Sequence, residues 1–95
     1  MLALIAVSHF QAHAPGDDDT YLVNAFGLLY HEVTASNLVR VNLEGEVIDP
    51  GSTRFGINKD GFVLHSAIHE ARRDIGCVLH LHTNAGIAVS QKLML

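Results

Sequence analysis

The chain has 95 residues, of which 48% are hydrophobic and 17% are charged, and its formal net charge at pH 7 is −4. This balance is typical of one small globular domain and excludes disordered and fibrous chains. The negative charge and the six Lys and Arg residues argue against a nucleic-acid partner, because a phosphate backbone requires a basic face. The single cysteine, Cys77, excludes an internal disulfide and favours a reducing, cytosolic location.

The first third of the chain predicts two strands. We expect one strand over Leu4 to His13, ended by Pro15-Gly16 and by a solvated acidic turn at Asp17–Asp19. Tyr21–Val23 predicts the second strand. The apolar start, Met1 to Val7, is not preceded by Lys or Arg and is too short to cross a bilayer. Neither a secretory signal nor a membrane span is therefore expected.

The middle of the chain predicts a turn and a hairpin. Thr34–Asn37 is typical of a turn or a single helical turn. Leu38–Asn42 and Val47-Ile48 are β-rich runs on either side of Glu44-Gly45, which is the pattern of a β-hairpin. We interpret Ser52–Asn58, which follows, as a loop.

A helix is predicted from about Asn58 to Arg73, with Asn58 or Asp60 as its N-cap. An apolar stripe at helical spacing is expected to face the sheet. Its members are Val63, Leu64, Ala67, Ile68 and Ala71. A second helix is predicted after Thr83-Asn84, and its pattern runs to Leu95 without a breaker. That pattern indicates a fragment of a larger domain.

The most informative stretch is Cys77–Thr83, which predicts a short buried strand with apolar walls and a buried Cys77. His80 and His82 are two positions apart, so on a strand they share one face, with Cα atoms about 6.5 Å apart. That spacing allows both imidazoles to bind one metal ion at about 2.0–2.1 Å. Two buried histidines bonded to backbone would give the same pattern, so both interpretations stay open.

The other histidines receive simpler interpretations. His65 and His69 are four residues apart on the predicted helix, but the segment lacks the glutamate of a zinc protease. We expect both to pack and to form hydrogen bonds, with His65 near the floor of the site and neither in the cavity of His80. His9 and His13 are expected to be solvated strand residues, His9 within reach of a substrate. His31 is expected to be structural, in a surface turn.

Together these motifs resemble the class II aldolase/adducin domain family. The segments that carry the resemblance follow one colinear order: Asn24–Tyr30, Glu32–Val39, Gly56–Phe62, His65–His69, Ala71–Asp74 and Cys77–Thr83. The resemblance implies an α/β fold, an α/β/α sandwich with a largely antiparallel central sheet. It also implies that residues 1–95 are a truncated, partial domain that lacks an N-terminal helical segment and the C-terminal half.

The resemblance further implies a metal site. His80 and His82 match two of the three histidines that bind Zn²⁺ in the aldolases, and the third would lie beyond Leu95. Fe²⁺ or Mn²⁺ is an alternative, because affinity alone does not select the metal. A metal held there would act as a Lewis acid on a small hydroxy-carbonyl substrate. The aldolases are homo-oligomers with active sites between subunits, so a homo-oligomer is implied for the longer form.

The departures from the family pattern concern proton transfer and phosphate binding. The acid/base glutamate of the aldolases is matched by Gly61, which can neither take nor give a proton, so the catalytic residue is unknown. Ser8-His9 stands where those aldolases have a Gly-Asn loop. These differences place the chain closer to the adducin-like branch. By resemblance, four further residues would contact substrate: Asn24, Gly27, Asn58 and Lys59.

Three functional interpretations follow. The first is metal-dependent, aldehyde-lyase-type chemistry in the full-length relatives, with this stretch inactive on its own and a poor metal binder. The second is a non-catalytic, adducin-like scaffold that binds actin or other cytoskeletal partners. The third is a gene fragment without a function of its own.

Overall fold

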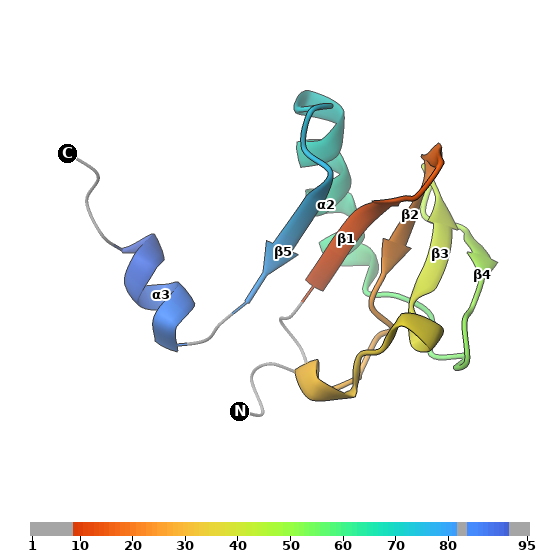
Figure 1. The fold of residues 1–95 in the computed structure, drawn as a ribbon, viewed down its shortest axis with the longest axis horizontal. Coiled ribbons are helices and arrows are strands. Elements are labelled where there is room, and N and C mark those ends of the chain that lie inside the picture. Colours follow the sequence, from red (N-terminus) through yellow and green to blue (C-terminus); the bar gives the residue numbers. More distant parts are fainter. Residues whose placement is uncertain (1–8, 82–83, 92–95) are drawn as a thin grey trace.

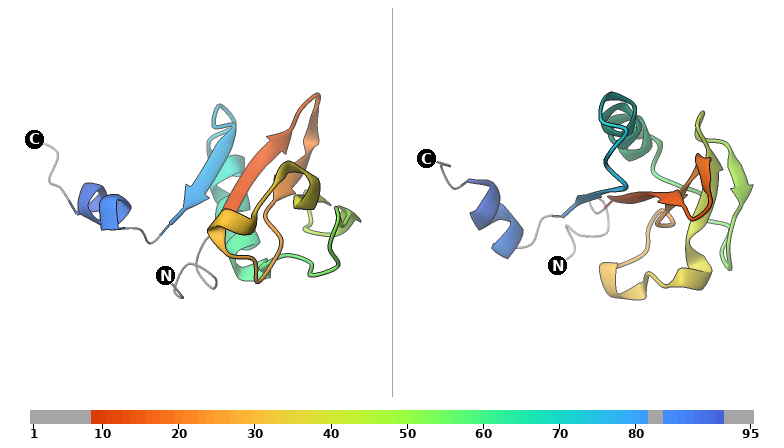
Figure 2. Two further views of the ribbon diagram at one scale, coloured as in Figure 1. Left: turned by 60° about the horizontal axis from the view of Figure 1, so that its bottom comes forward. Right: turned by 45° about the horizontal axis from the view of Figure 1, so that its top comes forward.

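A computed structural model describes residues 9–81 and 84–91. They form a five-stranded antiparallel sheet in the order β4-β3-β2-β1-β5, with helix α2 against one face (Figures 1 and 2). The strands are β1 (His9–Ala14), β2 (Asp17–Val23), β3 (Val39–Asn42), β4 (Val47–Asp49) and β5 (Cys77–His80). The helices are α2 (Lys59–Ala71), α3 (Asn84–Ser90) and two single 3₁₀ turns, η1 (Tyr30–Glu32) and η2 (Ala35–Asn37). Figure 2 shows the η1–η2 segment on the sheet face opposite to α2.

The first hairpin, β1–β2, turns at Pro15-Gly16, where Gly16 has φ +77°. The predicted acidic turn at Asp17–Asp19 is wrong, because these residues begin β2. Arg40 of β3 explains the difference: its Nη2 lies 2.9 Å from Asp17 Oδ2, and its Nε donates to the hydroxyl of Thr20. A cross-strand cation thus accommodates a carboxylate at the start of the strand.

The second hairpin, β3–β4, confirms the prediction from the Glu44-Gly45 pattern. Gly45 has φ +87°, a conformation that glycine adopts without steric cost. Asn42 Oδ1 accepts hydrogen bonds from the backbone N–H groups of Glu44 and Glu46, which closes the turn. The predicted turn at Thr34–Asn37 is confirmed as η2.

The apolar core lies between β2, β3 and the start of α2. Val23, Ala25, Val39 and Val41 are fully buried, and Phe62 packs onto them from the helix. The register pairs Val23 with Val39, so both side chains lie on the same sheet face. This core fixes the first turns of α2 to the sheet.

Helix α2 begins as predicted, with Asn58 as its N-cap: Asn58 Oδ1 accepts from the N–H groups of Asp60 and Gly61. The predicted buried face is wrong. Val63 is 66% exposed and Leu64 56%, Ala67 and Ala71 are exposed, and Ile68 is half-buried. The buried positions are instead Phe62, His65 and His69. They also follow helical spacing, and their rings fill the space between helix and sheet that an aliphatic stripe would fill.

Helix α2 leads into β5 as expected, but β5 is not a buried strand. Among the described residues it pairs with β1 alone, at the edge of the sheet. Cys77 is exposed and Leu79 is 52% exposed, which corrects the expectation that this strand lies in the sheet interior. The predicted second helix is present as α3, beyond the end of β5 (Figure 1). None of the described helices has the length and apolar character needed to cross a membrane.

Candidate functional site

The pairing of β1 with β5 places His9 beside His80. The two residues are directly opposite in the antiparallel register, so their side chains share the sheet face that α2 covers. His80 is exposed at the edge, whereas His9 is only 3% exposed. The expectation that His9 is solvated is therefore wrong, because α2 and β5 enclose its ring.

His82, the second predicted metal ligand, lies outside the described residues. Its convergence with His80 therefore stays a prediction. Within residues 9–81 and 84–91, no three His, Cys, Asp or Glu side chains are arranged to hold a metal ion.

His65 lies on α2, and its ring is close to those of His9 and His80. It is 2% exposed, and its Nδ1 lies 3.0 Å from the carbonyl oxygen of Gly61. Its ring centroid lies 4.4 Å from that of His9 and 6.4 Å from that of His80, and its plane is within 16° of the His80 plane. The predicted hydrogen-bonding role is confirmed. The expectation that His65 does not enter the cavity of His80 stays a prediction.

Burial also sets the charge state of His65. Burial, with a smaller contribution from the neighbouring His9, lowers the pKa of this imidazole to about 4, against the opposing effect of the Gly61 hydrogen bond. His65 is therefore neutral at pH 7. Because a carbonyl only accepts, the proton of the neutral ring is on Nδ1, and Nε2 carries a lone pair. Nε2 is buried and has no hydrogen-bond partner among the described residues.

A chain of hydrogen bonds orients His9. Its Nε2 lies 3.2 Å from Gln11 Oε1, and Gln11 Nε2 donates to Ser66 Oγ on α2 at 3.0 Å. Because the amide oxygen of Gln11 only accepts, His9 carries its proton on Nε2. Burial lowers the pKa of His9, and this effect outweighs the Gln11 hydrogen bond. His9 thus presents an uncharged ring beside His80 at neutral pH.

Gly61 lies against this ring. A Cβ added at Gly61 would be 2.5 Å from His9 Nδ1, which is closer than any real contact allows. His9 therefore occupies the space that a side chain at position 61 would need. The neighbouring Asn58 uses its side-chain oxygen to cap the helix, and Lys59 is exposed at the first turn. Their predicted contacts with substrate stay predictions.

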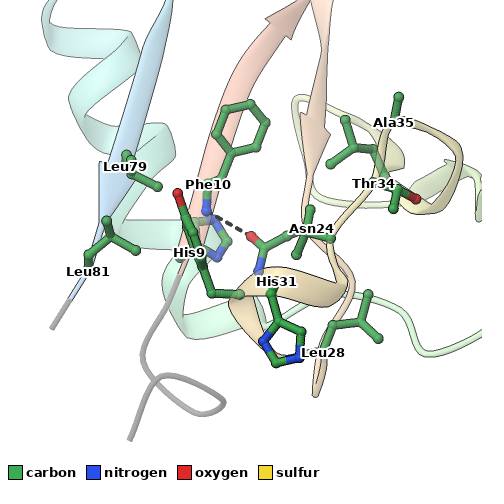
Figure 3. A pocket seen from close by; sticks show the side chains of 12 residues that line it. His9, Phe10, Asn24, Leu28, His31, Thr34, Ala35, Leu79 and Leu81 are labelled. Carbon is green, nitrogen blue, oxygen red and sulfur yellow. Dashed lines mark hydrogen bonds between the residues drawn. The ribbon is translucent and has the colours of Figure 1, made fainter. Parts of the chain in front are cut away.

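A largely apolar cavity of about 660 Å³ lies on the sheet face opposite to α2 (Figure 3). Phe10, Leu79 and Leu81 line it from β1 and the β5 end, and the η1–η2 segment lines the other side. Asn24, another predicted substrate contact, is in this wall, and its Oδ1 accepts from the N–H of Phe10 at 2.7 Å. His9 also lines the cavity, while its ring packs against His65 on the α2 side of the sheet.

The remaining predicted contact, Gly27, is in the loop after β2 and has φ +87°. The N–H of Phe26 donates to the carbonyl of Gly56 at 2.9 Å, which ties this loop to the segment before α2. The loop that carries Asn24 and Gly27 and the helix start that carries Asn58 are thus connected through the backbone. The link is this backbone hydrogen bond, and it does not depend on a contact between the predicted substrate residues.

A second histidine pair lies further along α2. His69 is 2% exposed, and its ring nitrogens lie 3.2 Å from the carbonyl oxygens of Gln11 and Ile75. His13 is half-buried, with its ring 4.8 Å from His69 and 4.9 Å from Tyr21. The predicted packing role of His69 is confirmed, and the expectation that His13 is solvated is wrong.

Sequence reasoning missed the polar layer that joins these histidines. Gln11 and Ser66 connect β1 to α2, and neither was singled out. A signal was present: positions 9, 11 and 13 of β1 alternate with Phe10 and Ala12, and all three are polar. On a strand, that alternation places three polar side chains on one face. The exposed His31 remains a surface residue of η1, as predicted.

Comparison with known proteins identifies related chains. The family model described as the class II aldolase and adducin N-terminal domain matches residues 6–94. Alpha-adducin of Rattus norvegicus is 52% identical over 83 residues, which are 87% of this chain and 11% of that protein.

Two solved structures have similar folds. An aldolase II superfamily protein from Pseudomonas syringae superposes with a TM-score of 0.78 at 54% identity, over 92% of this chain and 34% of that one. L-fuculose 1-phosphate aldolase from Glaciozyma antarctica superposes with a TM-score of 0.78 at 37% identity, over 90% of this chain and 34% of that one. This chain therefore spans about a third of the solved relatives and about a ninth of the adducin.

Proposed function

Because the chain belongs to the class II aldolase and adducin N-terminal domain family, we propose that it carries the metal-binding edge of an aldolase-type site. The substrate class is a small hydroxy-carbonyl compound. The sheet and α2 form part of the aldolase II fold. We place them, as a partial domain, in the complete α/β/α sandwich of a longer, homo-oligomeric protein.

The observation that supports this proposal most is the arrangement around His80. An exposed histidine at a sheet edge lies beside two buried, neutral imidazoles, and one of them, His65, has an unpartnered acceptor nitrogen. Neutral imidazoles are the form in which histidine serves a divalent metal site. We propose His80 and His82 as two ligands of Zn²⁺, with Fe²⁺ or Mn²⁺ as alternatives. When bound, such an ion polarises the carbonyl oxygen of the substrate.

The chain's own residues limit the chemistry at this edge. Gly61 supplies no proton-transfer group, and the close contact with His9 leaves no space for one there. His9 and His65 are uncharged near neutral pH, so they do not compete with a cation for the site. We therefore expect binding and orientation of the substrate, but no cleavage of a ketose phosphate, from residues 1–95 alone.

Equilibrium dialysis of the full chain against Zn²⁺ tests the proposal. Two histidines supply half of a tetrahedral shell, so we expect binding weaker than about 1 µM. His80→Ala and His82→Ala should each abolish it. His31→Ala removes an exposed histidine of η1 that lines the apolar cavity and not the His80 edge; it is the control and should leave zinc binding unchanged. Binding tighter than about 1 µM would contradict the expected half shell, and binding that survives both substitutions would reject the proposed ligands.

A second candidate function is a non-catalytic, adducin-like scaffold. The observation that favours it is that position 61 is a glycine and has no acid/base group. Co-sedimentation of the chain with actin filaments, with His80→Ala as a parallel sample, separates the two functions. Sedimentation that is independent of His80 and of zinc would support the scaffold.

A further inference from the structure

We propose that the apolar cavity of about 660 Å³ is the docking site of the chain's own N-terminal segment, Met1–Val7. In this arrangement the segment crosses the sheet face opposite to α2 and covers the cavity wall. The inference goes beyond the proposed function and is independent of it, because no step involves a metal ion or its ligands.

The wall of the cavity is apolar and open to solvent. Its apolar side chains are half-buried or exposed, among them Phe10, Leu28, Val33, Leu38, Leu79 and Leu81 (Figure 3). On the α2 face, by contrast, Val23, Val39 and Val41 are fully buried. A contiguous apolar surface rimmed by polar residues marks a place that another group covers.

The chain that enters β1 finds no strand to pair with before His9. On one side, the pairing with β2 ends at Gln11, and the N–H of Phe10 donates to the side chain of Asn24 at 2.7 Å. On the other side, β5 ends opposite His9. Among residues 9–81 and 84–91, neither neighbour of β1 extends past it. The first half of the strand predicted over Leu4–His13 would therefore lack a ladder.

The segment that precedes β1 fits the cavity in chemistry and in reach. Met1–Val7, which lies outside the described residues, consists of seven apolar residues. Ser8 joins it to His9 and Phe10, which both line the cavity. Seven extended residues span about 23 Å, whereas the two strand spacings from β5 to β2 amount to about 10 Å. The segment is thus long enough to cross the whole wall from its point of attachment.

The covalent attachment favours this segment over a free occupant. A group tethered by a short linker has an effective concentration on the order of millimolar at its site. Docking removes the apolar surface of both the segment and the cavity wall from water, which is the dominant favourable term in association. A second copy of the chain would have to displace the tethered segment before it could reach Phe10 or Leu79.

Nuclear Overhauser contacts in the full chain test the proposal directly. The methyl groups of Leu4 and Ile5 should contact the ring of Phe10 and the methyl groups of Val33 and Leu38. A mixture of labelled and unlabelled chains separates contacts within one chain from contacts between chains. Contacts found only between chains would assign the cavity to a second copy. Backbone contacts of residues 4–8 with residues 81–83 would instead show a longer β1–β5 ladder, and either result would overturn the proposal.

Binding of the apolar dye anilinonaphthalene sulfonate gives a second readout. Leu4→Ser combined with Ile5→Ser should raise the affinity of the chain for the dye about tenfold, as expected if the cavity is open about a tenth of the time in the wild type. Val63→Ser combined with Leu64→Ser is the matched control, because it removes a similar pair of side chains from the exposed outer face of α2. The control should not raise the affinity.

An equal gain in both double variants, or no gain in the N-terminal one, would overturn the proposal. If the N-terminal variant does not fold, the contacts of the wild-type chain decide alone, and their absence from the cavity wall contradicts docking. Neither readout requires a bound metal, so failure of the proposed zinc site leaves this test unaffected.

Discussion

The same sheet face and the same helix build two different interiors. Under the start of α2, Val23, Val41 and Phe62 form an aliphatic and aromatic core. Beside it, between α2, β1 and β5, the space is filled by imidazoles and amides held by hydrogen bonds. Two buried imidazole nitrogens, on His13 and His65, have no hydrogen-bond partner among the described residues. The first interior holds the fold together, and the second places polar groups beside an exposed edge. The comparison teaches that stability and the candidate site occupy separate halves of one interface.

The largest loss of stability should follow a substitution in the aliphatic half, the core under the start of α2. Phe62→Ala should lower the free energy of unfolding by about 3–5 kcal/mol, because Phe62 is 7% exposed and anchors α2 to both strands. Urea denaturation at pH 7, followed by circular dichroism, measures it. A loss below about 1 kcal/mol would show that this half does not carry the fold.

Acid should destabilise the histidine half, the polar layer between α2, β1 and β5, before it affects the aliphatic half. The pKa of His65 is lowered from 6.5 to about 4 in the folded chain, so the unfolded state binds more protons between these values. Stability is then fully present above pH 6.5 and falls as the pH drops toward 4, by up to about 1.4 kcal/mol per pH unit from this group. His9, whose pKa is also lowered, adds to the fall.

Urea midpoints measured from pH 7.5 to pH 4 provide the check. His65→Gln should flatten the dependence, because it removes the titrating group and keeps a polar side chain. An unchanged slope in that variant would mean that other groups cause the acid sensitivity.

Gly61→Ala should destabilise the chain by about 1–3 kcal/mol, since its methyl group would lie 2.5 Å from His9 Nδ1. In a helix without that contact, the same substitution is normally stabilising. The sign should therefore reverse in a His9→Ala background. A double-mutant cycle measures the coupling, and additive effects would show that His9 does not fill this space.

The smallest effect should be on the outer face of α2. Leu64→Ala should change the free energy of unfolding by only about 0.5 kcal/mol, because the side chain is 56% exposed. Compared with Phe62→Ala two positions earlier, it tests which face of the helix meets the sheet. A loss of unfolding free energy close to that of Phe62→Ala would support the buried apolar stripe that the sequence predicts.

The local elements of the fold could be predicted from the sequence. The β3–β4 hairpin, the Asn58 cap and the 3₁₀ turn at Ala35–Asn37 depend on nearest neighbours along the chain. Such signals are present in short windows of sequence. The family motif, which matches residues 6–94, is a colinear sequence property and was visible for the same reason.

The errors concern partners that are distant in sequence. Which face of α2 is buried depends on what β1 offers, and β1 offers His9 and Gln11, so histidines rather than Val63 meet it. The exposure of Cys77 depends on the position of β5 at the sheet edge, which no local pattern encodes. Hydropathy scales count histidine as polar, so the helical spacing of His65 and His69 did not indicate a buried face.

The central claim is that the histidine half, and not the aliphatic half, holds the metal. Paramagnetic broadening by Mn²⁺, observed by NMR on the full chain, tests it most directly. The account predicts that the ring signals of His80, His65 and His9 broaden first, while the methyl signals of Val39 and Val41 stay sharp. Broadening centred on the exposed His31, or on the carboxylates at the start of β2, would contradict it.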